Sequence, residues 1–170
     1  GNVAPGTSPG ILNSGDISFS SGSFFDVEIG GTSAGNAITN HDQLRITGTV
    51  NLGNATLTTT AFNSFVPIAG NKFTILVNDG TDAIIGTFNG LDEGDTITDF
   101  LGSGLDATIT YVANTDTGIV GNDVVLTVVS PITTPTLSIS DVMVAEGQSG
   151  TTTFTFNVTL SAATASSFRV

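Results

Sequence analysis

Residues 43–59 read Gln-Leu-Arg-Ile-Thr-Gly-Thr-Val-Asn-Leu-Gly-Asn-Ala-Thr-Leu-Thr-Thr. Apolar and polar residues alternate within segments of a few residues, and each segment ends at a glycine or an Asn-containing pair. A period of two predicts β-strands. The apolar positions that we expect to point inward are Leu44, Ile46, Val50, Leu52 and Leu57. Very short strands with glycine corners and no intervening helix are more typical of successive edges of a β-solenoid than of a hairpin meander.

The same pattern extends in both directions along the chain. In the stretch 24–29, Phe25, Val27 and Ile29 share one face, and Asp26 and Glu28 share the other. Further strands are expected at Lys72–Val77, Ile84–Phe88, Thr96–Leu101 and Ala107–Val112, the last pairing with Val124–Val129; loops are expected at Thr32–His41, Phe62–Gly70 and Gly90–Asp95. The sequence therefore predicts an all-β fold, with a short β-solenoid or β-sandwich-like unit over residues 1–130.

A linker rich in proline and threonine, residues 131–135, is expected to end this unit, because proline is kept out of interior strands. Residues 136–170 contain three strand-like stretches, Leu137–Ile139, Val142–Val144 and Thr152–Leu160. Three short strands are too few for an independent sheet domain. We expect this segment to be incomplete alone and to be completed by another chain or by neighbouring β-domains.

The charge balance excludes several classes of partner. Fifteen acidic residues oppose three basic ones, Arg45, Lys72 and Arg169, for a net charge of −12. Nucleic acid binding needs clustered Lys and Arg, so nucleic acid is excluded as a partner. No run approaches the roughly 20 apolar residues of a membrane span, so no membrane insertion is expected. The chain has no cysteine, which rules out disulfides and thiolate metal sites.

Two stretches resemble known families. The first consists of Pro5–Gly10, Gly15–Ile17, Phe25–Ile29, Asp42–Leu44, Lys72–Leu76, Gly86–Gly94 and Gly121–Thr127. Together they resemble the C-terminal end of the β-solenoid passenger region of autotransporter-like and haemagglutinin-like bacterial exoproteins, over residues 3–129. This resemblance implies a secreted protein located outside the cell or on its surface.

The second resemblance is shorter and covers residues 135–170. Pro135–Val142, Ala145–Gly150 and Thr152–Ser161 are similar to the opening of a Calx-β domain, an extracellular calcium-binding β-sandwich. The similarity implies that Glu146 corresponds to an early calcium ligand of that family. The other ligands of that family come from later loops, so residues 135–170 alone are expected to form an incomplete Calx-β-type segment without a complete site.

Calcium is the one cofactor that the sequence suggests, and its candidate ligands are Glu146, Asp92, Glu93 and Asp95. Calcium takes six to eight oxygen ligands, and these carboxylates lack the spacing of an EF-hand loop. A turn glutamate and a solvated acidic loop are therefore the simpler interpretations of the two motifs. The loop containing Asn114, Asp116, Asn122 and Asp123 is similarly polar, but its Gly121-Asn122-Asp123 motif occurs only once.

The one candidate pair for acid–base catalysis is His41-Asp42, and the sequence has no Gly-x-Ser-x-Gly nucleophile motif. We expect His41 to lie on the surface of a loop and the chain not to be an enzyme. The predicted function is a structural or adhesive module of a secreted bacterial surface protein that self-associates or assembles into fibres by strand addition. The alternatives are a calcium-binding extracellular spacer, or a carbohydrate-binding or polysaccharide-cleaving β-solenoid.

Overall fold

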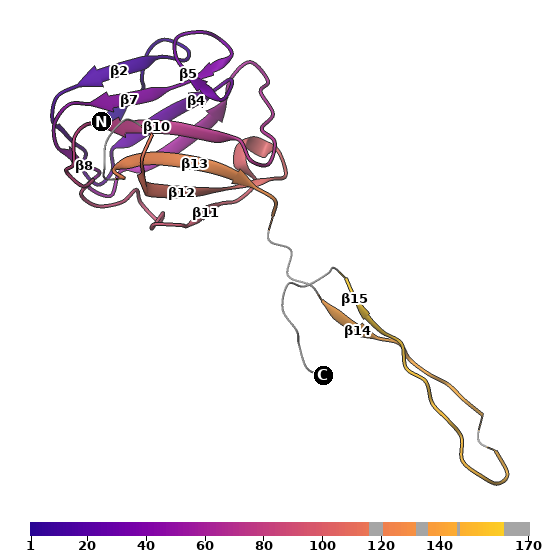
Figure 1. Cartoon of the computed structure of the whole chain (residues 1–170). Coiled ribbons are helices and arrows are strands. Elements are labelled where there is room, and N and C mark those ends of the chain that lie inside the picture. The colour runs from indigo at the N-terminus through magenta and orange to yellow at the C-terminus, as the bar shows by residue number, and fades with distance from the viewer. Residues whose placement is uncertain (116–120, 132–135, 146, 162–170) are drawn as a thin grey trace. The chain divides into compact units, whose positions relative to one another are not determined.

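The computed structural model describes residues 1–115, 121–131, 136–145 and 147–161. Within these ranges the regular structure is β-strand, apart from one 3-10 turn at Phe100–Gly102, which confirms the expected all-β class. The chain divides into two compact units, residues 1–131 and 132–170 (Figure 1). Each unit is described by itself below.

Three parallel ladders organise the first unit. The first ladder contains β1 (Asn2–Val3), β4 (Phe24–Ile29) and β9 (Thr56–Ala61). The second contains β2 (Ile11–Ser14), β7 (Gln43–Ile46) and β10 (Lys72–Asn78). The third contains β3 (Ile17–Ser18) and β8 (Val50–Asn51), continued by a parallel bridge from Asn51 to Ile85.

The chain visits the three ladders in turn, and we call each stretch that supplies one member to every ladder a coil. The first coil contains β1, β2 and β3; the second contains β4, β7 and β8; the third contains β9, β10 and the bridge at Ile85. Backbone and side-chain hydrogen bonds join coils across 32 or 33 positions in the sequence, as between Gly10 and Asp42 or Asp16 and Thr49. Coil-on-coil pairing is thus the repeated contact of this unit.

Antiparallel strands complete the second ladder on its far side. β10 pairs with β13 (Asp123–Val129), β13 with β12 (Asp106–Ala113), and β12 with β11 (Thr96–Ile97). The result is a six-stranded mixed sheet in the order β11-β12-β13-β10-β7-β2, visible in Figure 1. The expected pairing of 107–112 with 124–129 is confirmed, with Ile109 opposite Leu126.

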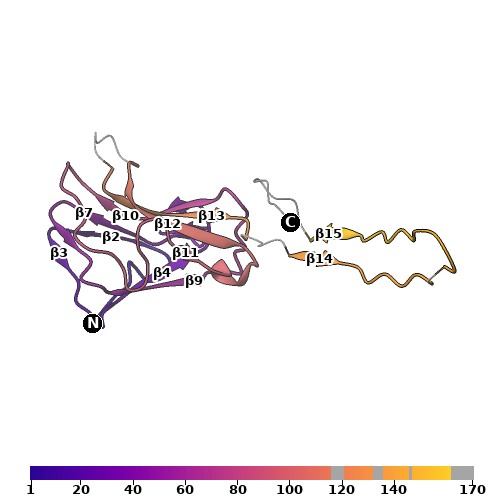
Figure 2. The ribbon, with the colours of Figure 1, turned by 90° about the horizontal axis from the view of Figure 1, so that it is seen from below.

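The core lies between the sheets, which face each other in Figure 2 with β4 and β9 on one side and β7 and β10 on the other. Register places Val3 over Phe25, Leu12 over Leu44, and Ile17 over Val50. The three side chains of the second coil, Phe25, Leu44 and Val50, have no exposed surface. Of the five residues expected to point inward, four are buried and Leu57 is half-buried against the same core.

Aromatic rings fill the centre of this core. Phe25 lies 6.0 Å from both Phe19 and Phe88, measured between ring centroids, and Phe88 lies 6.0 Å from Tyr111. The hydroxyl of Tyr111 donates a hydrogen bond to the carbonyl of Leu91 (2.7 Å) and accepts one from the backbone N–H of Phe88 (3.1 Å). The phenylalanines of the first unit therefore act largely as core residues, as aromatic side chains with satisfied polar ends commonly do.

The prediction of a loop at Thr32–His41 was wrong in part. Residues 30–42 leave β4, form β5 (Ser33–Ala34) and β6 (Asn40–His41), and return to β7; we call this stretch the excursion. β6 pairs antiparallel with β4 through Ile29 and His41, and parallel with β5. These strands were missed because two-residue strands made of Ser, Asn and His carry no hydrophobic alternation.

Other boundaries also differ from the prediction. The strand expected at Thr96–Leu101 ends at Ile97, because Asp99 and Leu101 adopt left-handed backbone conformations around the 3-10 turn. Ile84–Phe88 contributes isolated bridges at Ile85 and Phe88 rather than a strand. Corners of this kind break a strand that composition alone suggests.

The described part of the second unit is a two-stranded antiparallel ribbon. β14 (Leu137–Ile139) pairs with β15 (Val158–Leu160), with Leu137 opposite Leu160 and Ile139 opposite Val158. No strand forms at Val142–Val144, and of Thr152–Leu160 only the last three residues form one. Leu137, Ile139, Met143, Phe154, Phe156 and Val158 are exposed over 46–99% of their surface. A two-stranded ribbon is marginally stable alone in water.

Gly53 is a corner glycine whose substitution tests the coil-on-coil contact. Its φ is +51°, and a Cβ there would overlap the carbonyl of Phe19 in the neighbouring coil. We expect Gly53→Ala to lower the free energy of unfolding by more than about 1 kcal/mol, through both strain and overlap. Chemical denaturation measures it. The matched control is Gly15→Ala, whose Cβ would meet nothing within 4 Å; equal effects of the two substitutions contradict the described corner.

Candidate functional site

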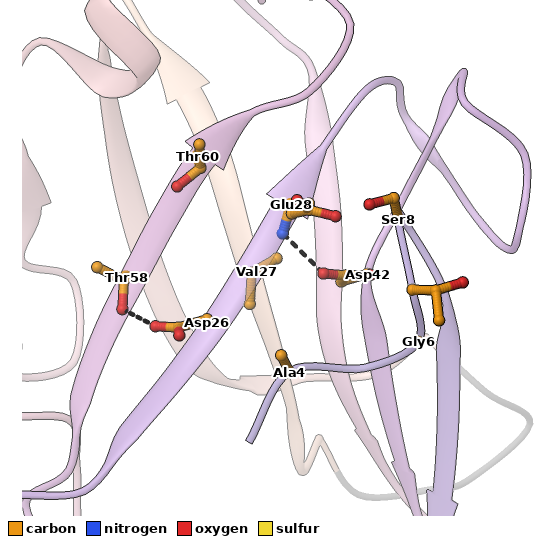
Figure 3. A pocket seen from close by; sticks show the side chains of 10 residues that line it. Ala4, Gly6, Ser8, Asp26, Val27, Glu28, Asp42, Thr58 and Thr60 are labelled. Atoms are coloured by element: carbon orange, nitrogen blue, oxygen red, sulfur yellow. Dashed lines mark hydrogen bonds between the residues drawn. The ribbon is translucent and has the colours of Figure 1, made fainter. Parts of the chain in front are cut away.

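A groove of about 430 Å³ lies on the outer side of β4 and β9 (Figure 3). The alternation of β4 turns Asp26 and Glu28 outward, and Thr58 and Thr60 project from β9 beside them. Ala4, Gly6, Thr7 and Ser8 of the loop between β1 and β2, together with Asp42, complete the lining. Val27 also contributes to the lining, so the groove combines carboxylates and hydroxyls with apolar surface.

Asp42 forms the inner wall of the groove and ties two coils together. One carboxylate oxygen accepts a hydrogen bond from the backbone N–H of Gly10 (2.5 Å), and the other accepts one from the backbone N–H of Glu28 (2.8 Å; Figure 3). Burial raises the pKa of Asp42, the two N–H donors oppose that rise, and the nearby charge of Glu28 adds to it. Both oxygens are already engaged, so this carboxylate serves the fold.

Asp26 is engaged in a similar way. Its carboxylate accepts hydrogen bonds from the hydroxyl of Thr58 on β9 (Figure 3) and from the side-chain amide of Asn2 on β1 (2.5 Å). One aspartate thus links a side chain in each of the three coils. Glu28 is the remaining carboxylate of the groove and forms no side-chain hydrogen bond among the described residues. The Glu28 carboxylate, beside the hydroxyls of Thr7, Ser8 and Thr60, can accept hydrogen bonds from a polar ligand.

The prediction that His41 lies on the surface was wrong, since only 2% of its surface is exposed. Its ring packs edge-on to Phe73 at 5.6 Å between centroids, with Nδ1 3.0 Å from the carbonyl oxygen of Gly31 and Nε2 3.2 Å from that of Thr74. Burial lowers the pKa of His41, and the two carbonyl contacts oppose that shift. The ring contacts two backbone carbonyls and an aromatic core residue, and these contacts indicate a structural role for His41.

The carboxylates of the acidic loop at residues 92–95 do not converge on a common point. The Glu93 carboxylate accepts hydrogen bonds from the hydroxyl of Thr110 (2.6 Å) and the backbone N–H of Tyr111 (2.6 Å). The Asp95 carboxylate accepts one from the backbone N–H of Asp92 (2.8 Å), closing a turn. Glu93 therefore fixes the loop against β12, and Asp95 stabilises the turn within the loop. Within residues 1–115, 121–131, 136–145 and 147–161, no three His, Asp or Glu side chains form a group that could hold a metal ion.

The remaining predicted residues are placed as follows. Glu146 and Asp116 lie outside the described residues. Asp123 is fully buried, and its carboxylate accepts hydrogen bonds from the backbone N–H of Asn78 (3.0 Å) and from the N–H and hydroxyl of Thr115 (2.7 and 2.6 Å). Asn122 is 1% exposed, and its amide donates to the carbonyls of Asp79 and Asp82. The structure brings Asn122 and Asp123 into the fold of the β10–β13 corner.

Comparison with protein-family models, with curated proteins and with solved structures found no match for the chain. The two family resemblances seen in the sequence therefore stay predictions. Among the described residues no helix has the length and apolar character needed to cross a membrane.

The burial of His41 generates a prediction about pH. The folded-state pKa is lowered from 6.5, so below pH 6.5 the unfolded chain binds a proton more readily than the folded one. We expect the free energy of unfolding to fall as the pH is lowered from 6.5 to about 5, above the range in which most carboxylates titrate. Denaturant melts of the chain and of His41→Gln at several pH values measure this slope. A slope that His41→Gln leaves unchanged contradicts the assignment.

The acidic loop generates a prediction about calcium. The Glu93 and Asp95 carboxylates already bind donors within the fold, so we expect calcium to leave the melting temperature unchanged relative to a chelator, since only ligands that bind the folded state raise it. Thermal melts with calcium and with chelator measure the effect. A calcium-dependent rise contradicts this expectation. Comparison of Glu146→Gln with Glu93→Gln then shows whether the ion lies in the second segment or in the acidic loop.

Proposed function

We propose that this chain is a structural or adhesive module of a secreted bacterial surface protein, in which residues 1–131 act as a short β-solenoid. The observation that carries the proposal is the in-register stacking of coils along three parallel ladders. Apolar side chains of adjacent coils pack against each other. In the second coil, Phe25, Leu44 and Val50 have no exposed surface. Such a stack is suited to a structural role.

The placement of the acidic residues supports the same function. Asp16 accepts hydrogen bonds from the backbone N–H and hydroxyl of Thr49 (2.8 and 2.9 Å), which lower the pKa of Asp16. Asp42 and Asp26 also bind donors from neighbouring coils. Carboxylates that accept hydrogen bonds from backbone N–H groups stabilise turns and ladders. In this chain they are used as parts of the frame, which supports a structural role.

The ribbon of residues 136–161 supports association with other β-structure. Its register places Leu137, Ile139, Val158 and Leu160 on one face. Phe154 and Phe156, which precede β15, are also exposed. Apolar faces of this kind commonly mark contact sites with a partner. We propose that this face packs against a neighbouring β-domain or a second chain, which fits an incomplete Calx-β-type segment.

Limited proteolysis with a protease of broad specificity tests the proposed frame. Paired, buried backbone resists cleavage, because cleavage needs local opening. We expect a lasting fragment that ends near residue 131, with early cleavage beyond that point, identified by mass spectrometry. Early cleavage between residues 11 and 78 contradicts a rigid stack, and turnover of a polysaccharide by the purified chain contradicts a purely structural or adhesive role.

A further inference from the structure

One exposed turn of the first unit carries the single Asn-Gly pair of the chain, Asn89-Gly90. The turn runs from Phe88 to Leu91, and the backbone N–H of Leu91 donates a hydrogen bond to the carbonyl of Phe88 (3.1 Å). Asn89 and Gly90 are both exposed, whereas Phe88 is fully buried. Gly90 has a φ of +70°, and a Cβ at this position would meet nothing within 4 Å. The pair therefore lies in open solvent at the tip of an anchored turn.

An Asn-Gly pair can undergo a spontaneous reaction with water. The backbone nitrogen of Gly90 attacks Cγ, the side-chain carbonyl carbon of Asn89, and the side-chain amide nitrogen leaves as ammonia. The product is a cyclic succinimide. Water then opens this ring at either carbonyl, which yields aspartate or isoaspartate, in which the main chain runs through the side-chain carbon. Glycine favours the first step, because it has no side chain to obstruct the attack and its backbone is permissive.

The described hydrogen bonds leave both reacting groups of this pair available. Neither the side chain of Asn89 nor the backbone N–H of Gly90 forms a hydrogen bond with a residue that the structure describes. By contrast, the backbone N–H of Thr115, which follows Asn114, donates to the carboxylate of Asp123 (2.7 Å). A nitrogen held in such a bond is hindered from attacking the preceding side chain. The structure therefore favours the reaction at Asn89 over Asn114.

The hydroxyl of Tyr111 binds both ends of the same turn. It accepts a hydrogen bond from the backbone N–H of Phe88 (3.1 Å) and donates one to the carbonyl of Leu91 (2.7 Å). Tyr111 is buried, and its ring packs against that of Phe88 at 6.0 Å between centroids. Isoaspartate adds one methylene carbon to the main chain between Phe88 and Leu91. The longer segment must distort the turn, so we expect at least one of the two hydrogen bonds to be lost.

We propose that Asn89 is a spontaneous modification site, at which deamidation through a succinimide produces isoaspartate and releases the turn at residues 88–91 from Tyr111. Water is the one co-reactant, and ammonia is the leaving group. The release leaves a buried polar group without its partner, which is unfavourable. The modified chain is therefore less stable than the fresh chain. This reaction depends only on the described turn, and not on the proposed role of the chain.

Peptide mapping by mass spectrometry follows the reaction in the folded chain, incubated in mildly alkaline buffer. We expect Asn89 to deamidate at least about 10-fold faster than Asn63, an exposed asparagine followed by serine, because glycine has no side chain that hinders the attacking nitrogen. Labelling with an isoaspartate-specific methyltransferase distinguishes isoaspartate from aspartate. Equal rates at Asn89 and Asn63, or a product at Asn89 that contains no isoaspartate, overturn the proposal.

Thermal melts before and after the incubation measure the loss of stability. The aged chain should melt a few degrees below the fresh chain. Asn89→Gln, whose longer side chain closes a less favourable ring, should keep its melting temperature. Tyr111→Phe lacks the hydroxyl, so ageing should lower its melting temperature by less than that of the unsubstituted chain. An equal fall in Asn89→Gln shows that the damage lies elsewhere, and an equal fall in Tyr111→Phe shows that Tyr111 is not released; either result overturns the proposal.

Discussion

The first unit depends on one constraint. Each inward-pointing side chain must pack on the inward-pointing side chain at the same position of the preceding coil. Parallel pairing fixes this register, because slipping by one residue would turn every inward side chain outward. Leu12, Leu44 and Leu76 occupy successive positions of one ladder for this reason. The corners must then turn within a few residues, which explains the left-handed conformations of Asn54 and Gly53 where the third ladder passes to the first.

The same constraint accounts for the unusual use of charge. A net charge of −12 with three basic residues leaves few cations for the carboxylates to contact. Asp16, Asp42 and Asp123 are instead bound by backbone N–H groups at corners, where turning strands leave donors without ladder partners. Their negative charge is thus distributed along the corners of the stack. Burial of the Asp42 carboxylate is unfavourable for its charge and raises its pKa.

Much of the fold followed from hydrophobic alternation. The strands at 24–29, 43–46 and 72–78 and the pairing of β12 with β13 were predictable, because their apolar residues alternate and their ends carry glycine or asparagine. The excursion was not, because β5 and β6 are short and polar. The roles of His41 and Asp42 were also hidden, since their burial depends on contacts with Thr74 and Gly10, some 32 residues away. No local pattern reports such contacts.

The corner between the first and second ladders differs in length from coil to coil. It spans residues 4–10 in the first coil, the excursion 30–42 in the second, and residues 62–71 in the third, while the ladders on both sides keep their register. The length of this corner can therefore vary without changing the register between the coils. Foreign loops or epitopes inserted between the exposed Asn63 and Ser64, in the corner that borders no further parallel coil, would be displayed at a fixed site without rebuilding the scaffold.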